Sequence, residues 1–217
     1  MLLHGSSRTL VNLLLFALAE DASPSFQWLD IRTRDEQPAK LDPAGLGWID
    51  EGQLWTVDPV EAFAPDNAAA NAALFQLVRD DGTPGAVARL SEFLRLPGRF
   101  QEILARRPPA HRPGVLVVAN ADRTASSSPG DGLLPILDAV GSAGVRLFVG
   151  FKGPPPSARD HFGTVLRVDG EDAHRWRGAS LTHERGSPMV GLGTGQSALL
   201  ADLPFAARTL HRAVSGT

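Results

Sequence analysis

Short apolar runs alternate along the chain with longer segments in which apolar residues recur every three or four positions. Apolar runs of about four to eight residues are typical of strands, and the wider spacing is typical of helices that bury one face. The pattern predicts strands at 1–4, 26–32, 54–57, 114–119, 145–151, 164–168, 179–183, 189–192 and 199–203. It predicts helices at 9–20, 66–79, 86–107, 133–140 and 204–214, with loops at 33–53 and 124–132.

The predicted strand GVLVVA at 114–119 is apolar without interruption, and VRLFVGF at 145–151 is predicted as a second central strand. Such runs are typical of strands buried on both faces of a parallel sheet. Strands separated by helix-length segments indicate parallel crossovers, and the short strands after Trp176 indicate antiparallel strands at one edge. We therefore predict an α/β fold with helices on both faces of a mainly parallel sheet. One domain over 1–217 is expected, with a core at 1–170 and a C-terminal meander and helix at 171–217.

The N-terminal apolar run from Leu10 to Ala19 has two interpretations. A charged residue before it and Ala17-Leu18-Ala19 at its end are features of a cleaved signal peptide. The run is shorter than the roughly 20 residues that cross a bilayer, and Asn12 interrupts it. It also fits the first helix of the predicted fold, which is the interpretation we favour.

Composition narrows the classes of function. The chain has no cysteine, which excludes disulfides and thiolate metal sites, and its net charge is −3. A negative chain has no overall positive field to attract nucleic acid or anionic lipid. Two stretches, 95–112 and 174–185, are rich in arginine, and we interpret them as solvated faces with a packed Trp176. If either stretch is a binding surface, the negative net charge favours a protein partner over DNA. We expect a cytoplasmic protein that does not bind membranes.

The first strand-to-helix turn, Gly5-Ser6-Ser7-Arg8-Thr9, carries the strongest candidate chemistry. In parallel sheets ligands bind at the carboxyl ends of the strands, and a helix N-terminus preceded by small residues favours anions. A basic residue followed by a hydroxyl residue is the order that phosphate loops use for phosphate and magnesium. The competing interpretation is an ordinary helix start with Ser or Thr as the cap.

This turn, the order of elements, the VLVV and VRLFVGF strands and the antiparallel tail resemble the RecA/KaiC-like branch of P-loop NTPases. The resemblance implies a RecA-like three-layer fold and an ATP-driven, oligomeric protein. It places Gly5, Ser6 and Ser7 in the phosphate loop, Arg8 at its lysine and Thr9 at its magnesium residue. It also suggests Asp122 for magnesium or water, and Asp30 for the catalytic acid that follows the second strand.

Three departures from the family pattern G-x-x-x-x-G-K-[ST] concern the same site. The loop is shortened, and an arginine replaces the compact lysine. The strand that should end in an aspartate ends in Ala119 and Asn120, with Asp122 two residues later. Asp30 stands where an acidic pair is expected. Phosphoryl transfer depends on the lysine, the magnesium ion and the acid together, so these departures suggest that hydrolysis is lost while the fold is kept.

The sequence therefore favours a non-catalytic RecA/KaiC-like domain with a degenerate nucleotide site, which acts as a regulatory or assembly subunit. Its partner would be a second copy or an active relative. The first alternative is an ATPase or switch that binds ATP with magnesium, with Thr9 and Asp122 at the metal and Asp30 or Asp122 as catalytic acid. The second is a DNA-associated accessory protein that resembles recombinase paralogues. Whether the phosphate site is open, collapsed or filled by a side chain such as Arg8 is left open.

A later motif, Gly191-Leu-Gly-Thr-Gly-Gln-Ser197, imitates a phosphate loop with Gln196 at the lysine position. A true phosphate loop or dinucleotide motif needs a unit of roughly 30 residues around it, and too little chain follows. We predict a turn between late strands.

Overall fold

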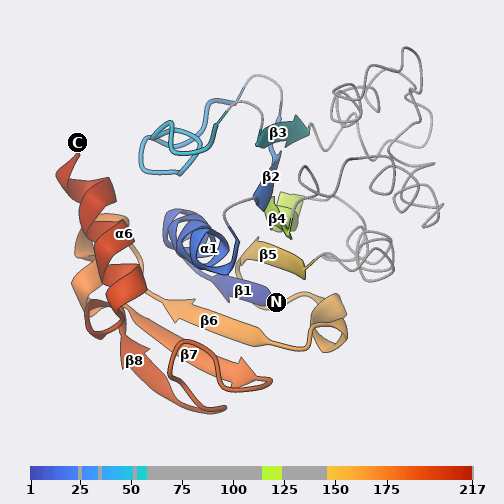
Figure 1. Cartoon of the computed structure of the whole chain (residues 1–217), viewed down its shortest axis with the longest axis vertical. Helices are drawn as coiled ribbons and strands as arrows, with labels where there is room; N and C mark the ends of the chain where they lie inside the picture. The colour runs from blue at the N-terminus through green and yellow to red at the C-terminus, as the bar shows by residue number, and fades with distance from the viewer. Residues whose placement is uncertain (24–25, 34–35, 51–52, 58–113, 124–145, 217) are drawn as a thin grey trace.

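The computed structural model describes residues 1–23, 26–33, 36–50, 53–57, 114–123 and 146–216. Its strands in these ranges form one eight-stranded sheet in the order β3-β2-β4-β5-β1-β6-β7-β8 (Figure 1). The neighbours from β3 to β6 are parallel, and β7 and β8 are antiparallel. The bounds are β1 Leu2–Gly5, β2 Phe26–Ile31, β3 Leu54–Val57, β4 Val115–Ala119, β5 Arg146–Lys152, β6 Val165–Asp169, β7 Ser180–Arg185 and β8 Ser197–Leu199. The predicted α/β class, with a parallel core and an antiparallel C-terminal edge, is confirmed.

Helix α1 (Arg8–Ala22) follows β1 directly and packs against β1, β4 and β5 on one face of the sheet. Every residue from Leu10 to Ala19 is buried, because α6 (Pro204–Ser215) and the 36–50 segment cover the side of α1 that faces away from the sheet (Figure 1). The apolar run that also resembled a signal peptide is thus the core helix of this structure. Each fully buried leucine in it contributes about 1.5–3 kcal/mol.

Aromatic side chains fasten the 36–50 segment to the two helices. The ring of Phe16 on α1 lies 5.5 Å from that of Trp48 and 6.4 Å from that of Trp28 on β2. The guanidinium of Arg212 on α6 lies 4.2 Å from the centre of the Trp48 ring, within the range of a cation–π interaction. These contacts fix a segment without helix or strand against α1 and α6.

Two predicted strands near the C-terminus are wrong. Residues 189–192 form a tight turn with a single bridge between Met189 and Leu192, and Val190 and Gly191 have φ values of 49° and 82°. Residues 199–203 contain the last residue of β8 and the short 3-10 helix η7 (Leu200–Asp202). Leu192, Leu200 and Leu203 are nearly fully buried, so their apolar pattern reflects insertion into the core rather than strand alternation.

Three further 3-10 helices complete the described elements: η3 (Ala121–Arg123), η5 (Ser157–His161) and η6 (Ala173–Gly178). The helices predicted at 66–79, 86–107 and 133–140, the 124–132 loop and the arginines at 95–112 lie outside the described residues. The second helical layer and the single domain over 1–217 therefore stay predictions.

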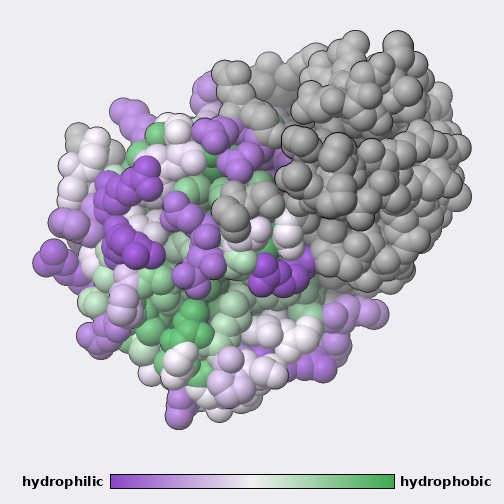
Figure 2. All heavy atoms as spheres, in the orientation of Figure 1, coloured by the Kyte–Doolittle hydropathy of each residue, from purple (hydrophilic) through white to green (hydrophobic). Residues whose placement is uncertain are grey.

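The described surface is mostly polar. In the view of Figure 2, hydrophilic residues cover much of α6, while apolar residues gather near its N-terminal end. Leu199, which is 46% exposed, is the large hydrophobic side chain that stands out among the described residues. Within those residues, no helix has the length and apolar character that crossing a bilayer requires.

Candidate functional site

The turn between β1 and α1 is built as a capped helix start. Ser7 is the N-cap, and its Oγ accepts a hydrogen bond from the Leu10 N–H at 3.4 Å. At Gly5 a Cβ would lie 2.4 Å from the Val168 carbonyl oxygen of β6, so the close approach of β1 to β6 requires glycine. The exposed Ser6 donates from its Oγ to the Gly170 carbonyl at 3.0 Å. Gly5, Ser6 and Ser7 thus each have a local structural task, and Thr9 lies half-buried in the first turn of α1.

The basic residue of this turn, Arg8, is paired with Asp122, the acid that follows β4. Arg8 Nη2 donates to Asp122 Oδ2 at 2.5 Å. Asp122 belongs to η3, just after β4, and its other oxygen accepts the Lys152 N–H at 3.0 Å from the end of β5. Asp122 therefore joins α1, η3 and β5. Sequence reasoning placed Arg8 and Asp122 in one site, and the structure brings their side chains into direct contact.

This contact sets what the site can hold. A magnesium nucleotide needs the loop cation for its phosphates and the acid for its metal or water. Here the guanidinium and the carboxylate are occupied with each other, with side-chain exposures of 28% and 15%. Within the described ranges, no group of three or more histidines and acids is arranged to hold a metal ion. The described residues do not fit a working magnesium–nucleotide site unless this ion pair opens.

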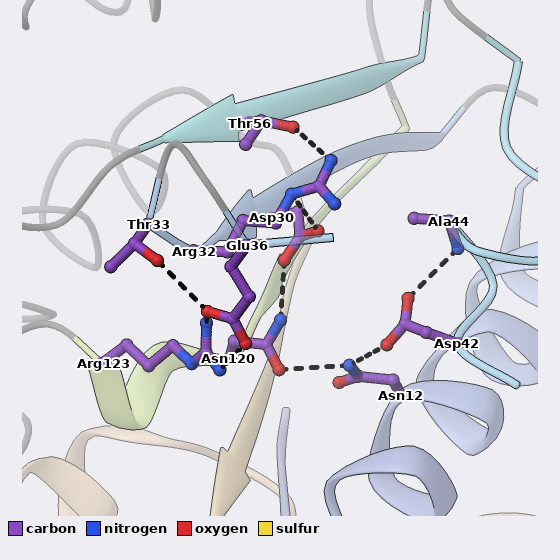
Figure 3. Close-up of polar contacts among 10 residues, drawn as sticks. All are labelled: Asn12, Asp30, Arg32, Thr33, Glu36, Asp42, Ala44, Thr56, Asn120 and Arg123. Atoms are coloured by element: carbon purple, nitrogen blue, oxygen red, sulfur yellow. Dashed lines mark hydrogen bonds and ion pairs between the residues drawn. The ribbon is translucent and has the colours of Figure 1, made fainter. Parts of the chain in front are cut away.

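Asp30, the candidate catalytic acid, belongs to a separate and buried group (Figure 3). It lies on β2 on the same face as Phe26 and Trp28, toward α1, and is 2% exposed. Its Oδ1 accepts from Asn120 Nδ2 at 2.6 Å, and its Oδ2 lies 3.2 Å from Arg32 Nε. Arg32 also donates to Thr56 on β3. Asp30 therefore contacts Asn120 and Arg32 rather than Arg8.

Asn120 continues this group toward α1. Its Oδ1 accepts from Asn12 Nδ2 at 3.2 Å, and the same nitrogen donates to Asp42 Oδ2 at 2.5 Å. Asp42 also accepts from the Ala44 N–H at 3.1 Å. We call Asp30, Asn120, Asn12 and Asp42 the acid–amide chain. All four are at most 7% exposed.

Burial governs the titration of both carboxyls in this chain. Desolvation raises the pKa of Asp30 from 3.8 to about 6; the negative charge of Asp42 adds to the rise, and Arg32 opposes it. Desolvation also raises the pKa of Asp42, against the hydrogen bond from Asn12. A buried carboxyl with a pKa near 6 is typical of functional sites. In this structure, however, both carboxyls are already surrounded by protein groups.

A second ion pair joins η3 to the 36–50 segment. The two terminal guanidinium nitrogens of Arg123, Nη1 and Nη2, donate to the Glu36 carboxylate, and Thr33 donates to it as well. The hydrogen bond from Arg123 lowers the pKa of Glu36. The turn after β4 is thus held on one side by Arg8 and on the other by Glu36.

The sequence does not reveal that Asn120, Asn12 and Asp42 form one group with Asp30. Signals for them exist: Asn12 is a polar residue inside an apolar helix, and Asn120 ends an apolar strand. Asn120 also has a φ of 59°, a left-handed conformation that asparagine tolerates better than most residues. Asp42 begins a turn by accepting from the residue two positions on, a habit of aspartate in loops.

The other candidate motifs have structural explanations. Trp176 is buried in the core with Arg177 5.7 Å from its ring centre, as the packed-tryptophan interpretation predicted. The segment 191–196 is a turn between β7 and β8, also as predicted, and Gln196 Oε1 accepts the Gly193 N–H at 2.8 Å.

Comparisons with known proteins find likeness among solved structures only. No family model matches the chain, and no curated protein matches it. Among solved structures, it is similar to a KaiC-like protein from the hyperthermophilic archaeon Pyrococcus horikoshii, with a TM-score of 0.48 and 12% identity. The match covers 90% of this chain and 82% of that one. A likeness this distant carries no argument about function, which is argued from the described residues instead.

Proposed function

We propose that this chain is a RecA/KaiC-like domain with a degenerate nucleotide site, which acts as a non-catalytic regulatory or assembly subunit. Its partner is a second copy or an active relative. The observation that carries the proposal is the ion pair between Arg8 at the first turn and Asp122 after β4.

The order of the strands supports the proposed RecA/KaiC-like relationship. The strand that leads into the turn is central, and β5 separates it from β4. Arg8 and Asp122 are 114 positions apart, yet they meet across the end of β5. The family resemblance assigns the two residues to one site, and their contact supports this assignment.

The non-catalytic part follows from what each candidate group already contacts. Arg8 and Asp122 neutralise each other, and a ligand would have to separate them before it could use either. Asp30, the remaining candidate acid, accepts from Asn120 and pairs with Arg32, and so contacts these residues rather than the Gly5–Thr9 turn. Transition-state stabilisation needs preorganised groups aimed at the ligand, and the described groups are aimed at each other.

The rival function is a nucleotide switch, and one observation favours it. The pair is partly exposed, and ion pairs in contact with solvent are worth only about 1 kcal/mol, so a polyphosphate could displace Asp122 from Arg8. In that case Asp122 and Thr9 would become free to approach magnesium. No observation among the described residues adds support to the DNA-associated alternative.

The experiment compares wild type, Arg8→Ala and the remote surface variant Arg185→Ala. Phosphate release from ATP and magnesium is measured for each, and their assembly state is measured by sedimentation. We expect no turnover in any of them and a discrete oligomer in the wild type. Magnesium-dependent turnover that Arg8→Ala abolishes and Arg185→Ala keeps would establish the switch instead. A monomer at every concentration would contradict self-assembly.

A further inference from the structure

The acid–amide chain is unevenly charged. It contains two nearly fully buried carboxyls, Asp30 and Asp42, and the one cation in ion-pair contact with either among the described residues is Arg32, at Asp30. Asp42 accepts hydrogen bonds from two neutral donors, the Asn12 side chain and the Ala44 backbone. A buried carboxylate without a cation is expensive, and such groups usually take up a proton instead.

We propose that the acid–amide chain binds one proton near neutral pH, and that this proton fastens the turn after β4 onto α1 and so keeps the Arg8–Asp122 pair closed. The inference is independent of the proposed function, because it concerns the turn itself and not a nucleotide or a partner.

The two asparagines explain why one proton serves both acids. Asn12 Nδ2 donates to Asp42 and to Asn120, and Asn120 Nδ2 donates to Asp30, so the two carboxyls lie at the ends of one hydrogen-bonded line. With both acids ionised, two negative charges repel each other across this line in a dry setting. With one acid neutral, the remaining charge is balanced by Arg32.

Several charged groups face the two acids. Asp30 faces Asp42, Arg32 and Arg123, and Asp42 faces Arg32 and Arg8. These cations lower the pKa of the two acids, but burial is the largest influence on both. The resulting pKa of Asp30, about 6, agrees with proton uptake close to neutrality.

Asn120 connects the proton to the ion pair. It holds a φ of 59°, and its side chain makes the two hydrogen bonds that keep it there. Its carbonyl accepts the Arg123 N–H at 3.0 Å, which closes the turn that presents Asp122. When the proton leaves, two negative charges are buried near each other, and this favours an opened turn that admits water to the two acids, although the charged Asp30 is itself a good acceptor for Asn120. Asp122 then moves away from Arg8 and from the Lys152 N–H.

The test follows two readouts in the intact protein by NMR. The side-chain carboxyl resonances of Asp30 and Asp42 report the proton, and exchange of the Lys152 amide, corrected for intrinsic exchange, reports the position of Asp122. In the wild type we expect one of the two carboxyls to titrate about two units above an ordinary aspartate. Protection of the Lys152 amide should fall roughly tenfold or more from about pH 5 to about pH 7.5.

An amide at position 30 removes one buried charge and keeps an oxygen that accepts from Asn120. Asp30→Asn should therefore keep Lys152 protected at both pH values, while the exposed control Asp50→Asn in the 36–50 segment should behave as wild type. Titration of both wild-type carboxyls in the ordinary aspartate range would overturn the proposal, and this readout needs no variant. Equal Lys152 protection in the wild type at both pH values would overturn the link to the ion pair.

Discussion

Two polar groups meet at the turn after β4, and they differ in burial and in charge balance. The Arg8–Asp122 pair is partly exposed and neutral overall. The acid–amide chain is buried and has more negative than positive charge. Water can replace a lost partner in the first group but not in the second. The Arg8–Asp122 pair should therefore decide what the turn after β4 binds, and the acid–amide chain should decide how stably the turn is held.

The largest effect is expected on the buried side. Asn12→Ala removes the donor to Asp42 and to Asn120, leaving two buried acceptors without partners, so the free energy of unfolding should fall by about 3 kcal/mol. Urea denaturation measures this loss. The matched control is Glu20→Ala, at an exposed position of the same helix, which should change stability by no more than about 0.5 kcal/mol. If Asn12→Ala lost no more stability than Glu20→Ala, the acid–amide chain would not contribute to the stability of the fold.

The next effect is a dependence of stability on pH. Because the folded-state pKa of Asp30 is raised, the folded protein binds more protons than the unfolded chain between the two values. Stability from this group is complete below about pH 4 and is lost as the pH rises through about 6. The shift corresponds to about 3 kcal/mol. Asp30→Asn should remove this dependence and be the more stable protein at neutral pH, as denaturation at several pH values will show.

Two outcomes would weaken the account of Asp30. One is a wild type that gains stability relative to Asp30→Asn as the pH rises. The other is a constant difference between the two proteins at every pH. The comparison between the two proteins matters because other carboxyls act in the opposite direction: the pKa of Glu36 is lowered by Arg123, so its contribution is lost as the pH falls.

A smaller effect is expected at the partly exposed pair. Arg8→Ala and Asp122→Ala should each lower the free energy of unfolding by about 1–2 kcal/mol. A double-mutant cycle should give a coupling energy of about 1 kcal/mol. The double variant should lose less than the sum of the two single losses, because each single variant already lacks the ion pair. Strictly additive losses would show that the two side chains do not interact in solution.

The smallest effect sharpens the contrast. The Arg185–Asp160 pair has side-chain exposures of 46% and 87%, and its nitrogen–oxygen distance is 2.8 Å. Such pairs contribute between nothing and about 1 kcal/mol, so Asp160→Ala should change the midpoint of denaturation hardly at all. If Asp160→Ala lost as much stability as Asp122→Ala, burial would not explain the difference between the two ion pairs.

Most of the sheet could be predicted because buried parallel strands are continuous apolar runs, as in β4 and β5. The late strands were predicted less well, since Leu192 and Leu200 are apolar for reasons of tertiary packing. The candidate positions Arg8 and Asp122 followed from a local motif and a family resemblance.

Their pairing, and the acid–amide chain, could not be predicted. Asn12 lies 30 positions from Asp42 and 108 from Asn120, so these contacts exist only once the sheet order is known. A single asparagine in an apolar helix indicates that a polar partner is needed. It does not say which of many distant residues provides it.

The most direct test of the central claim is a calorimetric titration of the wild type with ATP and magnesium, in parallel with Arg8→Ala and Asp122→Ala. If Asp122 closes the turn, the wild type and Arg8→Ala should bind no nucleotide up to about millimolar concentration. Asp122→Ala, in which Arg8 is free, should bind it more tightly than the wild type by about 1 kcal/mol or more. Micromolar binding by the wild type that Arg8→Ala abolishes would contradict the claim, because Arg8 would then serve a phosphate in preference to Asp122.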